Sequence, residues 1–249
     1  MRQPLVAGNW KMNGSSESIR ELIDGLLSGL DSKAEVLVCP PSVYVQQVRD
    51  SLAGSSVKVG LQNASDKQSG AYTGEISPLM AKDLGCAYVL IGHSERRSIY
   101  GETDEEVAAK FCSLVDHGIV PVLCVGETLE ERESGDTMKV VARQIETVLR
   151  TAGSQRLANF VIAYEPVWAI GTGLTASPEQ AQEVHASIRA LMAEDDQAMA
   201  DRTRVLYGGS MKAANAAELM AKPDVDGGLV GGASLVPSDF KAICHAAGQ

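Results

Sequence analysis

Short apolar runs alternate with amphipathic segments along the whole chain, and this alternation predicts its fold. The runs are rich in Val, Ile and Leu and almost entirely apolar, which is typical of parallel strands that are covered on both faces. Eight such runs lie at residues 5–7, 36–39, 57–61, 88–91, 119–125, 160–163, 205–207 and 228–230.

Between these runs, apolar residues recur at spacings of three and four, the period of an amphipathic helix. Leu22, Ile23 and Leu26 show this spacing after the first run. Helix starts are marked by capping residues, a helix-favouring proline or both. These starts are Ser77–Pro78, Thr103 with Glu106, Ser177–Pro178 with Gln180, and Asn215 with Glu218. The charged stretch that follows Thr128 shows no such pattern, and we expect it to be flexible.

The strand count decides the fold class. Eight strand–helix units of roughly 31 residues each use up a chain of 249 residues and close a parallel sheet on itself. The competing architecture is an open, doubly wound sheet, which usually has five or six strands. We therefore predict one domain, residues 1–249, with a (β/α)8 barrel fold.

Composition narrows the function classes. Aromatic residues make up only 4% of the chain, which argues against a sugar-binding groove or a base-stacking surface. The net charge of -10 makes nucleic acid and anionic membrane unfavourable partners. A small anionic ligand stays possible if backbone N–H groups and a few cations hold it locally.

The cysteines and the amino terminus indicate a compartment. Five widely spaced cysteines without a CxxC motif fit a reducing environment, and Cys39 and Cys124 fall within strands as small residues. Residues 1–8 lack a signal-peptide pattern, and no apolar run is long enough to span a bilayer. We expect a cytoplasmic protein.

Polar residues and glycines gather at the ends of the strands. In a barrel, every loop that follows a strand lies on one face, so these residues converge there. The set is Asn9, Lys11, His93, Ser94, Glu95, Glu127, Glu165, Gly171, Ser210, Gly231 and Gly232. Each has an ordinary structural explanation by itself. Together they supply a base, an imidazole, a single ammonium group and two glycine-rich nests for an anion.

The segment after the sixth strand has the composition of a lid. Pro166 stiffens its start, Val167 to Ile170 form an apolar tip, and Gly171 and Gly173 give backbone freedom on the far side. We predict that residues 166–176 close over Glu165. A partly buried loop is the plainer alternative.

Other chemical templates fit poorly. Residues 171–176 match the dinucleotide pattern GxGxxA, but five residues separate Glu165 from Gly171, so the pattern does not directly follow a strand. GxSxG and P-loop motifs do not occur, and the four histidines show no metal-ligand spacing. We expect neither a metal nor a cofactor.

Five motifs together resemble those of the triosephosphate isomerase family, whose fold is the TIM barrel. They are Gly8–Asn13 (GNWKMN), Gly92–Arg97 (GHSERR), Ala163–Gly173 (AYEPVWAIGTG), Tyr207–Ser210 (YGGS) and Val230–Ser234 (VGGAS). The resemblance extends from the first strand to the last. Two residues depart from the usual family pattern: Leu174 stands where lysine is common, and Met211 where valine is common.

The resemblance implies interconversion of dihydroxyacetone phosphate and glyceraldehyde 3-phosphate through an enediol(ate), a step of glycolysis and gluconeogenesis. It implies that Glu165 moves the proton, that a neutral His93 polarises the carbonyl, and that Lys11 and Asn9 stabilise negative charge. This family is the standard example of such a neutral histidine. Gly171, Ser210, Gly231 and Gly232 would hold the phosphate. The family also implies a homodimer through the loop from Gln62 to Ile76, for which a solvated, floppy loop is the alternative.

Two other functions are compatible with parts of the pattern. A glycosidase would use two of Glu95, Glu127 and Glu165, but scarce aromatic residues and two anion nests disfavour it. A non-catalytic sensor of a phosphorylated metabolite would keep the nests, yet it has no need for Glu165 and His93 close together.

Overall fold

The computed structural model describes residues 2–171 and 174–247. Its centre is a closed barrel of eight parallel strands in the order β1-β2-β3-β4-β5-β6-β7-β8, with β1 pairing β8. The strands are β1 Leu5–Asn9, β2 Glu35–Cys39, β3 Lys58–Leu61, β4 Tyr88–Ile91, β5 Val120–Val125, β6 Val161–Tyr164, β7 Arg204–Tyr207 and β8 Gly227–Val230. The (β/α)8 prediction is confirmed, and no end of a predicted strand differs from the observed one by more than two residues.

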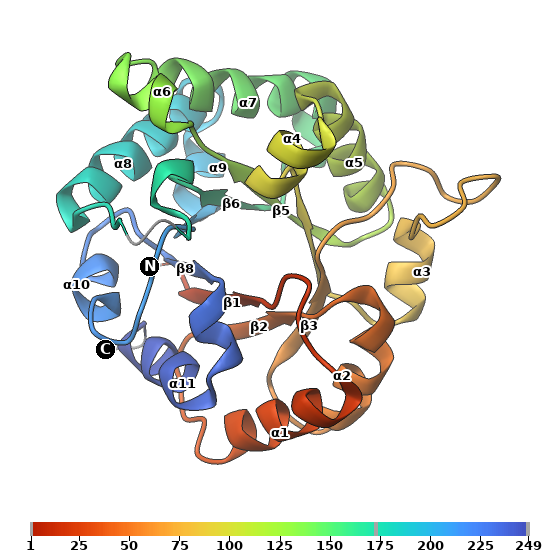
Figure 1. Cartoon of the computed structure of the whole chain (residues 1–249). Helices are drawn as coiled ribbons and strands as arrows, with labels where there is room; N and C mark the ends of the chain where they lie inside the picture. Colours follow the sequence, from red (N-terminus) through yellow and green to blue (C-terminus); the bar gives the residue numbers. More distant parts are fainter. Residues whose placement is uncertain (1, 172–173, 248–249) are drawn as a thin grey trace.

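Helices form a ring around the barrel (Figure 1). They are α1 Ser16–Leu27, α2 Val45–Ser51, α3 Pro78–Asp83, α4 Ser94–Tyr100, α5 Asp104–Asp116, α6 Leu129–Glu133, α7 Thr137–Ala152, α8 Pro178–Asp195, α9 Gln197–Arg202, α10 Ala216–Met220 and α11 Pro237–Ala246. Single 3-10 turns are η1 Ser42–Tyr44, η2 Ser154–Arg156, η3 Val167–Ala169 and η4 Gly232–Leu235. None of the helices in the described ranges is long and apolar enough to cross a membrane.

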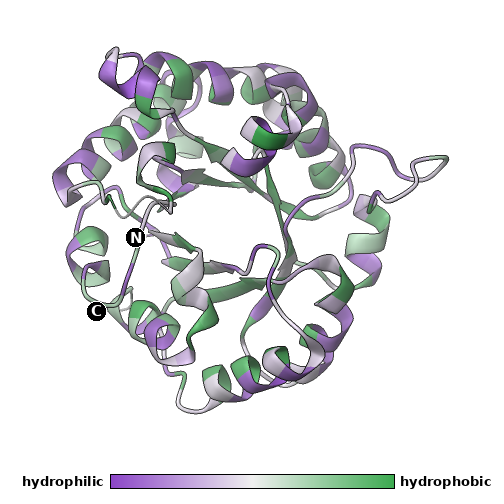
Figure 2. Cartoon of the chain, viewed as in Figure 1, coloured by the Kyte–Doolittle hydropathy of each residue, from purple (hydrophilic) through white to green (hydrophobic). Residues whose placement is uncertain are grey.

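Strand residues alternate between two cores. The inner core fills the barrel and consists of Leu5, Ala7, Leu37, Cys39, Tyr88, Leu90, Val122, Cys124, Val161, Ala163, Leu206 and Leu229. The alternate residues, such as Val6 and Val205, pack outward against the apolar faces of the helices. Figure 2 shows the polar residues gathered on the outer surface of the helix ring. Burial of Cys39 and Cys124 raises the pKa of both thiols, so they are unreactive packing residues.

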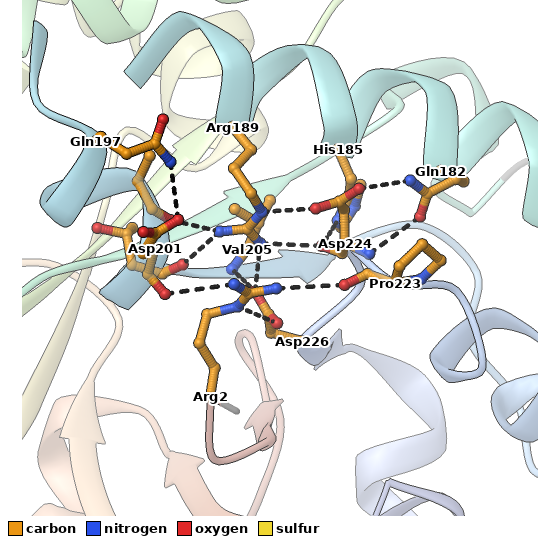
Figure 3. Close-up of polar contacts among 12 residues, drawn as sticks. Arg2, Gln182, His185, Arg189, Gln197, Asp201, Val205, Pro223, Asp224 and Asp226 are labelled. Carbon is orange, nitrogen blue, oxygen red and sulfur yellow. Dashed lines mark hydrogen bonds and ion pairs between the residues drawn. The ribbon is translucent and has the colours of Figure 1, made fainter. Parts of the chain in front are cut away.

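Polar groups close the end of the barrel at which the strands begin. Arg204 donates to Glu35 Oε2 at 2.6 Å and to the Tyr88 hydroxyl at 2.8 Å. Beside β7 and β8, Arg189 of α8 binds Asp224 and Asp226, and Arg2 also binds Asp226 (Figure 3). These contacts connect helix α8, the residues just before β8 and the amino terminus. The opposite end of the barrel, where the strands end, holds the candidate site.

Two local predictions were wrong. The charged stretch after Thr128 forms helix α6, which starts with a capping box between Thr128 and Glu131. Asn215 does precede α10, but its side chain does not cap the helix. It accepts from the Lys212 N–H and donates to the Ser210 carbonyl instead.

Candidate active site

Glu165 lies where β6 ends, and the barrel places it by simple alternation. Val161 and Ala163 point into the barrel, so the next inward position along the chain is residue 165. Its backbone N–H donates to the Val125 carbonyl at 2.7 Å, which continues the pairing of β6 with β5. Glu165 is only 2% exposed. A buried carboxylate is costly unless it is hydrogen-bonded.

Both oxygens of Glu165 have partners. Oε1 lies 2.9 Å from His93 Nε2, and Oε2 accepts from the Ser94 N–H at 2.8 Å. His93 and Ser94 come from the end of β4 and the first residue of α4. The carboxylate of Glu165 and the imidazole of His93 are therefore in direct contact, although the two residues are 72 positions apart in sequence.

His93 is held in one tautomer. It caps α4, and its Nδ1 accepts from the Glu95 N–H at 3.2 Å, so Nε2 carries the proton that faces Glu165. Burial disfavours the charged imidazole, but the Glu165 carboxylate and its hydrogen bond outweigh burial. The pKa of His93 consequently lies above its ordinary value while the two side chains are in contact.

Lys11 lies beside this pair with an unusual backbone. Its φ is 50°, and among the residues that the structure describes it is the only non-glycine with positive φ. The Asn9 side chain accepts from the Lys11 N–H at 3.0 Å, and the Gln62 side chain donates to the Lys11 carbonyl at 2.8 Å. Its ammonium group binds Glu95 Oε1 at 2.6 Å.

One cavity joins all the residues that the sequence singled out for catalysis and binding. It has a volume of about 470 Å³, within the range of small-molecule sites. Its walls include Asn9, Lys11, His93, Glu165, Gly171, Ser210, Gly231 and Gly232. Of the three carboxylates that a glycosidase would have used, Glu165 alone lines it, since Glu127 is completely buried and Glu95 faces a neighbouring hollow.

Two glycines leave one wall of the cavity bare. A Cβ built on Gly232 would meet no atom within 4 Å, and one on Gly231 would meet only Lys11 Cε at 3.6 Å. Protein packing therefore does not require glycine at these two positions. Open space over bare backbone beside an ammonium group is suited to an anionic ligand.

Comparison with known proteins decides the family. The model of the family described as triosephosphate isomerase matches residues 4–247. The chain is 55% identical to the triosephosphate isomerase of Pseudomonas putida (strain GB-1), with both chains covered completely. It is 57% identical to that of Dechloromonas aromatica (strain RCB), over 99% of this chain and 100% of the relative. It is also 57% identical to that of Pseudomonas aeruginosa (strain LESB58), with both chains fully covered.

The chain belongs to the triosephosphate isomerase family. This membership confirms the resemblance seen in the sequence and argues against the glycosidase alternative. Within the described part of the chain, no group of three or more His, Cys, Asp or Glu side chains has the arrangement of a metal site.

The segment predicted to be a lid, residues 166–176, is attached to the barrel at its first turn. Residues Val167–Ala169 form η3, the Val167 N–H donates to the Glu127 carbonyl, and the Trp168 indole N–H donates to Glu127 Oε1 at 3.0 Å. The Arg132 guanidinium lies 4.7 Å from the centre of the indole ring. Gly171 has φ 71°, a left-handed value that favours glycine. Thr172 and Gly173 lie outside the described residues.

The two departures from the usual triosephosphate isomerase pattern differ in their surroundings. Met211 is 3% exposed, and its sulfur occupies the space that a Cβ on Gly228 would need, at 2.5 Å from that position. Met211 is therefore built into the cavity wall against β8. Leu174 lies near the far end of the predicted lid segment and is 53% exposed.

Sequence reasoning missed a second cation. Lys212 also lines the cavity, whereas we had counted Lys11 as the single ammonium group of the site. Its only signal is its place directly after the YGGS motif and Met211 in the loop that follows β7. Lys212 is exposed, so it adds positive charge near the rim of the cavity.

Proposed function

We propose that the chain interconverts dihydroxyacetone phosphate and D-glyceraldehyde 3-phosphate, with Glu165, His93 and Lys11 as its catalytic residues and without a cofactor. The contact between the Glu165 carboxylate and His93 Nε2 at 2.9 Å, inside a cavity that also holds an ammonium group and a bare glycine wall, supports this proposal best. Relatives that are named triosephosphate isomerase match this chain over its full length and over theirs. Residues 1–249 would act as one catalytic domain.

Glu165 is the base in this proposal. A carbon acid beside a carbonyl is weak, so its proton leaves only if the developing oxyanion is stabilised at the same time. Glu165 removes the proton from one carbon and returns it to the next one. Since Ser94 N–H and His93 now occupy both of its oxygens, the carboxylate must give up at least one of these bonds to reach the substrate.

His93 is the electrophile. Its Nε2–H points into the cavity because Nδ1 is engaged by the Glu95 N–H, so it can donate to a substrate oxygen. Substrate that separates the imidazole from Glu165 removes the main cause of the raised pKa of His93, which favours the neutral ring. A neutral imidazole passes protons between the two oxygens more readily than a charged one.

Asn9, Lys11 and the glycine wall bind the rest of the substrate. Backbone N–H groups of Gly171, Ser210, Gly231 and Gly232 would hold the phosphate, and the three glycines among them have no side chain to obstruct close approach. Lys11 would contribute its charge to the phosphate and to the oxyanion, with Asn9 fixing its backbone. The lid, residues 166–176, would keep the enediol phosphate from losing phosphate to water.

The loop from Gln62 to Ile76 supports a homodimer. It protrudes from the body of the protein between β3 and α3 (Figure 1), and residues 67–75 are all exposed. Beside it lies a hollow whose walls include Met12, Tyr100, Lys11 and His93. Met12 is 96% exposed and Tyr100 is 71% exposed, so a partner's loop would bury apolar surface and support Lys11. We place the enzyme in the cytoplasm, where unpaired cysteines stay reduced.

A coupled assay of glyceraldehyde 3-phosphate conversion tests the activity, and Glu165→Asp tests the base. Shortening the side chain by one methylene withdraws the carboxylate from the carbon acid, so we expect kcat to fall by about 10² or more. KM should change little, because Glu165 does not hold the phosphate. A kcat equal to that of the wild type would remove Glu165 from the mechanism.

Sedimentation of the wild type and of Tyr72→Asp tests the dimer. Tyr72 lies at the exposed tip of the loop, and a buried, unpaired charge there would weaken association. We expect a wild-type dimer and a largely monomeric, less active variant. Full activity in a monomer would contradict loop docking.

A further inference from the structure

Residues 125–127, at the end of β5 and just after it, support the backbone of Glu165, the proposed catalytic base. The Val125 carbonyl accepts from the Glu165 N–H at 2.7 Å. A Cβ on Gly126 would lie 1.8 Å from the Glu165 carbonyl oxygen, so only a glycine permits this approach. Any shift of the Gly126 peptide would therefore move the backbone of Glu165.

The same short segment also holds the base of the lid. The Glu127 carbonyl accepts from the Val167 N–H at 3.1 Å. The Glu127 carboxylate accepts from the Tyr164 hydroxyl and from the Trp168 indole, both at 3.0 Å. Residues 125–127 thus contact the chain immediately before, at and after the catalytic carboxylate.

Two side chains of the helix layer hold this segment: Arg132 of α6 binds the Glu127 carboxylate at 3.3 Å, and Gln144 binds the Gly126 peptide itself. Gln144 lies in the middle of α7 and is 4% exposed. Its Oε1 accepts from the Gly126 N–H at 2.8 Å, and its Nε2 donates to the Gly126 carbonyl at 3.2 Å. One amide therefore satisfies both backbone groups of the glycine, as a neighbouring strand would do. The two bonds also define the orientation of the amide, because one end must accept and the other donate.

We propose that Gln144 is a positioning residue for the isomerisation. It holds the Gly126 peptide, and the segment around this peptide contacts both Glu165 and the first turn of the predicted lid. The inference rests on the proposed function of Glu165 and of the lid. Gln144 does not line the substrate cavity but a separate hollow behind Gly126 and Val167, so it acts through the segment that it holds. Its loss should affect chemistry and lid closure more than substrate binding.

The first test replaces Gln144 with leucine, which keeps the approximate shape and removes both bonds. Since small displacements of a catalytic group are costly, we expect kcat to fall between about tenfold and a hundredfold. KM should stay within about twofold, and inorganic phosphate released per turnover should rise several-fold as intermediate escapes.

The matched control is Gln182→Leu. Gln182 also spans from a helix to a loop with two bonds, donating to Asp224 Oδ2 at 2.6 Å and accepting from the Asp224 N–H at 3.1 Å. Figure 3 shows it beside the network around Arg189, where the strands begin. This variant should lose stability yet keep kcat, KM and the phosphate ratio. Equal kinetics in the two leucine variants would overturn the proposal.

The second test, Gln144→Glu, remains decisive if the leucine variant does not fold. A protonated carboxyl offers one donor and one acceptor to Gly126, as the amide does, whereas a carboxylate offers acceptors only and opposes the Gly126 carbonyl. The ratio of variant kcat to wild-type kcat should therefore rise as pH falls, and the phosphate ratio should return toward that of the wild type. A ratio that is constant with pH would refute the role of Gln144.

The activity of the wild-type protein distinguishes failure of the proposed function from failure of the role of Gln144. An inactive wild-type protein would refute the proposed function itself. An active wild type with a leucine variant that behaves like the control would refute only the role of Gln144.

Discussion

At the scale of single residues, Lys11 is the position where the site holds backbone strain. A left-handed conformation costs a non-glycine residue about 1–2 kcal/mol, and Lys11 has φ 50°. Three hydrogen bonds oppose the strain: one from the Lys11 N–H to Asn9 and two from the Gln62 amide, to the carbonyls of Lys11 and Cys39. Strain that is maintained in this way directs the ammonium group to one place on the cavity wall.

Lys11→Met tests whether that ammonium group is required. The variant keeps most of the side-chain length but removes the charge that would stabilise the oxyanion and phosphate, so we expect kcat/KM to fall by about 10³ or more. Lys222→Met is the control, because Lys222 binds Glu179 on the outer surface, away from the cavity. Steady-state kinetics of both variants provide the measurement. Rates like those of the wild type in Lys11→Met would show that other groups carry the negative charge.

At the scale of elements, the strands, the helix starts and the residues that follow each strand could be predicted, because they depend on local sequence patterns. Asn9 and Glu165 each come directly after a predicted strand, which is why they were placed at one mouth of the barrel from sequence alone. The structure adds that alternation past Ala7 and Ala163 turns both side chains inward. The capping boxes at Thr103 and Ser177 form as predicted. Helix α6 was missed because five residues, Leu129–Glu133, are too few to show apolar periodicity. Lys212 and Gln144 were missed because their roles arise from contacts between elements.

Loss of the proposed lid should affect one side reaction, the release of inorganic phosphate, more than it affects folding. Removing residues 170–173 and rejoining the chain leaves the contacts of Trp168 with Glu127 and Arg132 in place, so the barrel should still fold. We expect more inorganic phosphate per turnover, because water would reach the enediol phosphate before it is reprotonated. Phosphate release and isomer formation are measured in the same reaction mixture. An unchanged ratio would contradict a protective role of the lid.

At the scale of the whole molecule, the two ends of the barrel have different tasks. The cavity end holds the reactive groups, whereas the other end carries ion pairs that close the structure. His185 of α8 lies within this second network, with its Nδ1 3.1 Å from the Asp224 carbonyl and with Arg189, Asp224 and Asp226 around it (Figure 3). It is completely buried, and burial lowers its pKa to about 4.

This lowered pKa predicts how global stability depends on pH. Between the ordinary pKa of about 6.5 and about 4, the unfolded chain binds a proton at His185 that the folded chain does not. The free energy of unfolding therefore falls as pH decreases through this window, by about 3 kcal/mol for this group. Urea unfolding of the wild type and of His185→Gln at fixed protein concentration isolates the effect, since the variant keeps the other titrating groups, such as Glu102. The difference in unfolding free energy between the two proteins should shrink or reverse toward pH 4. A difference that is constant from pH 7 to pH 4 would mean that His185 is as easily protonated in the folded protein as in the unfolded one.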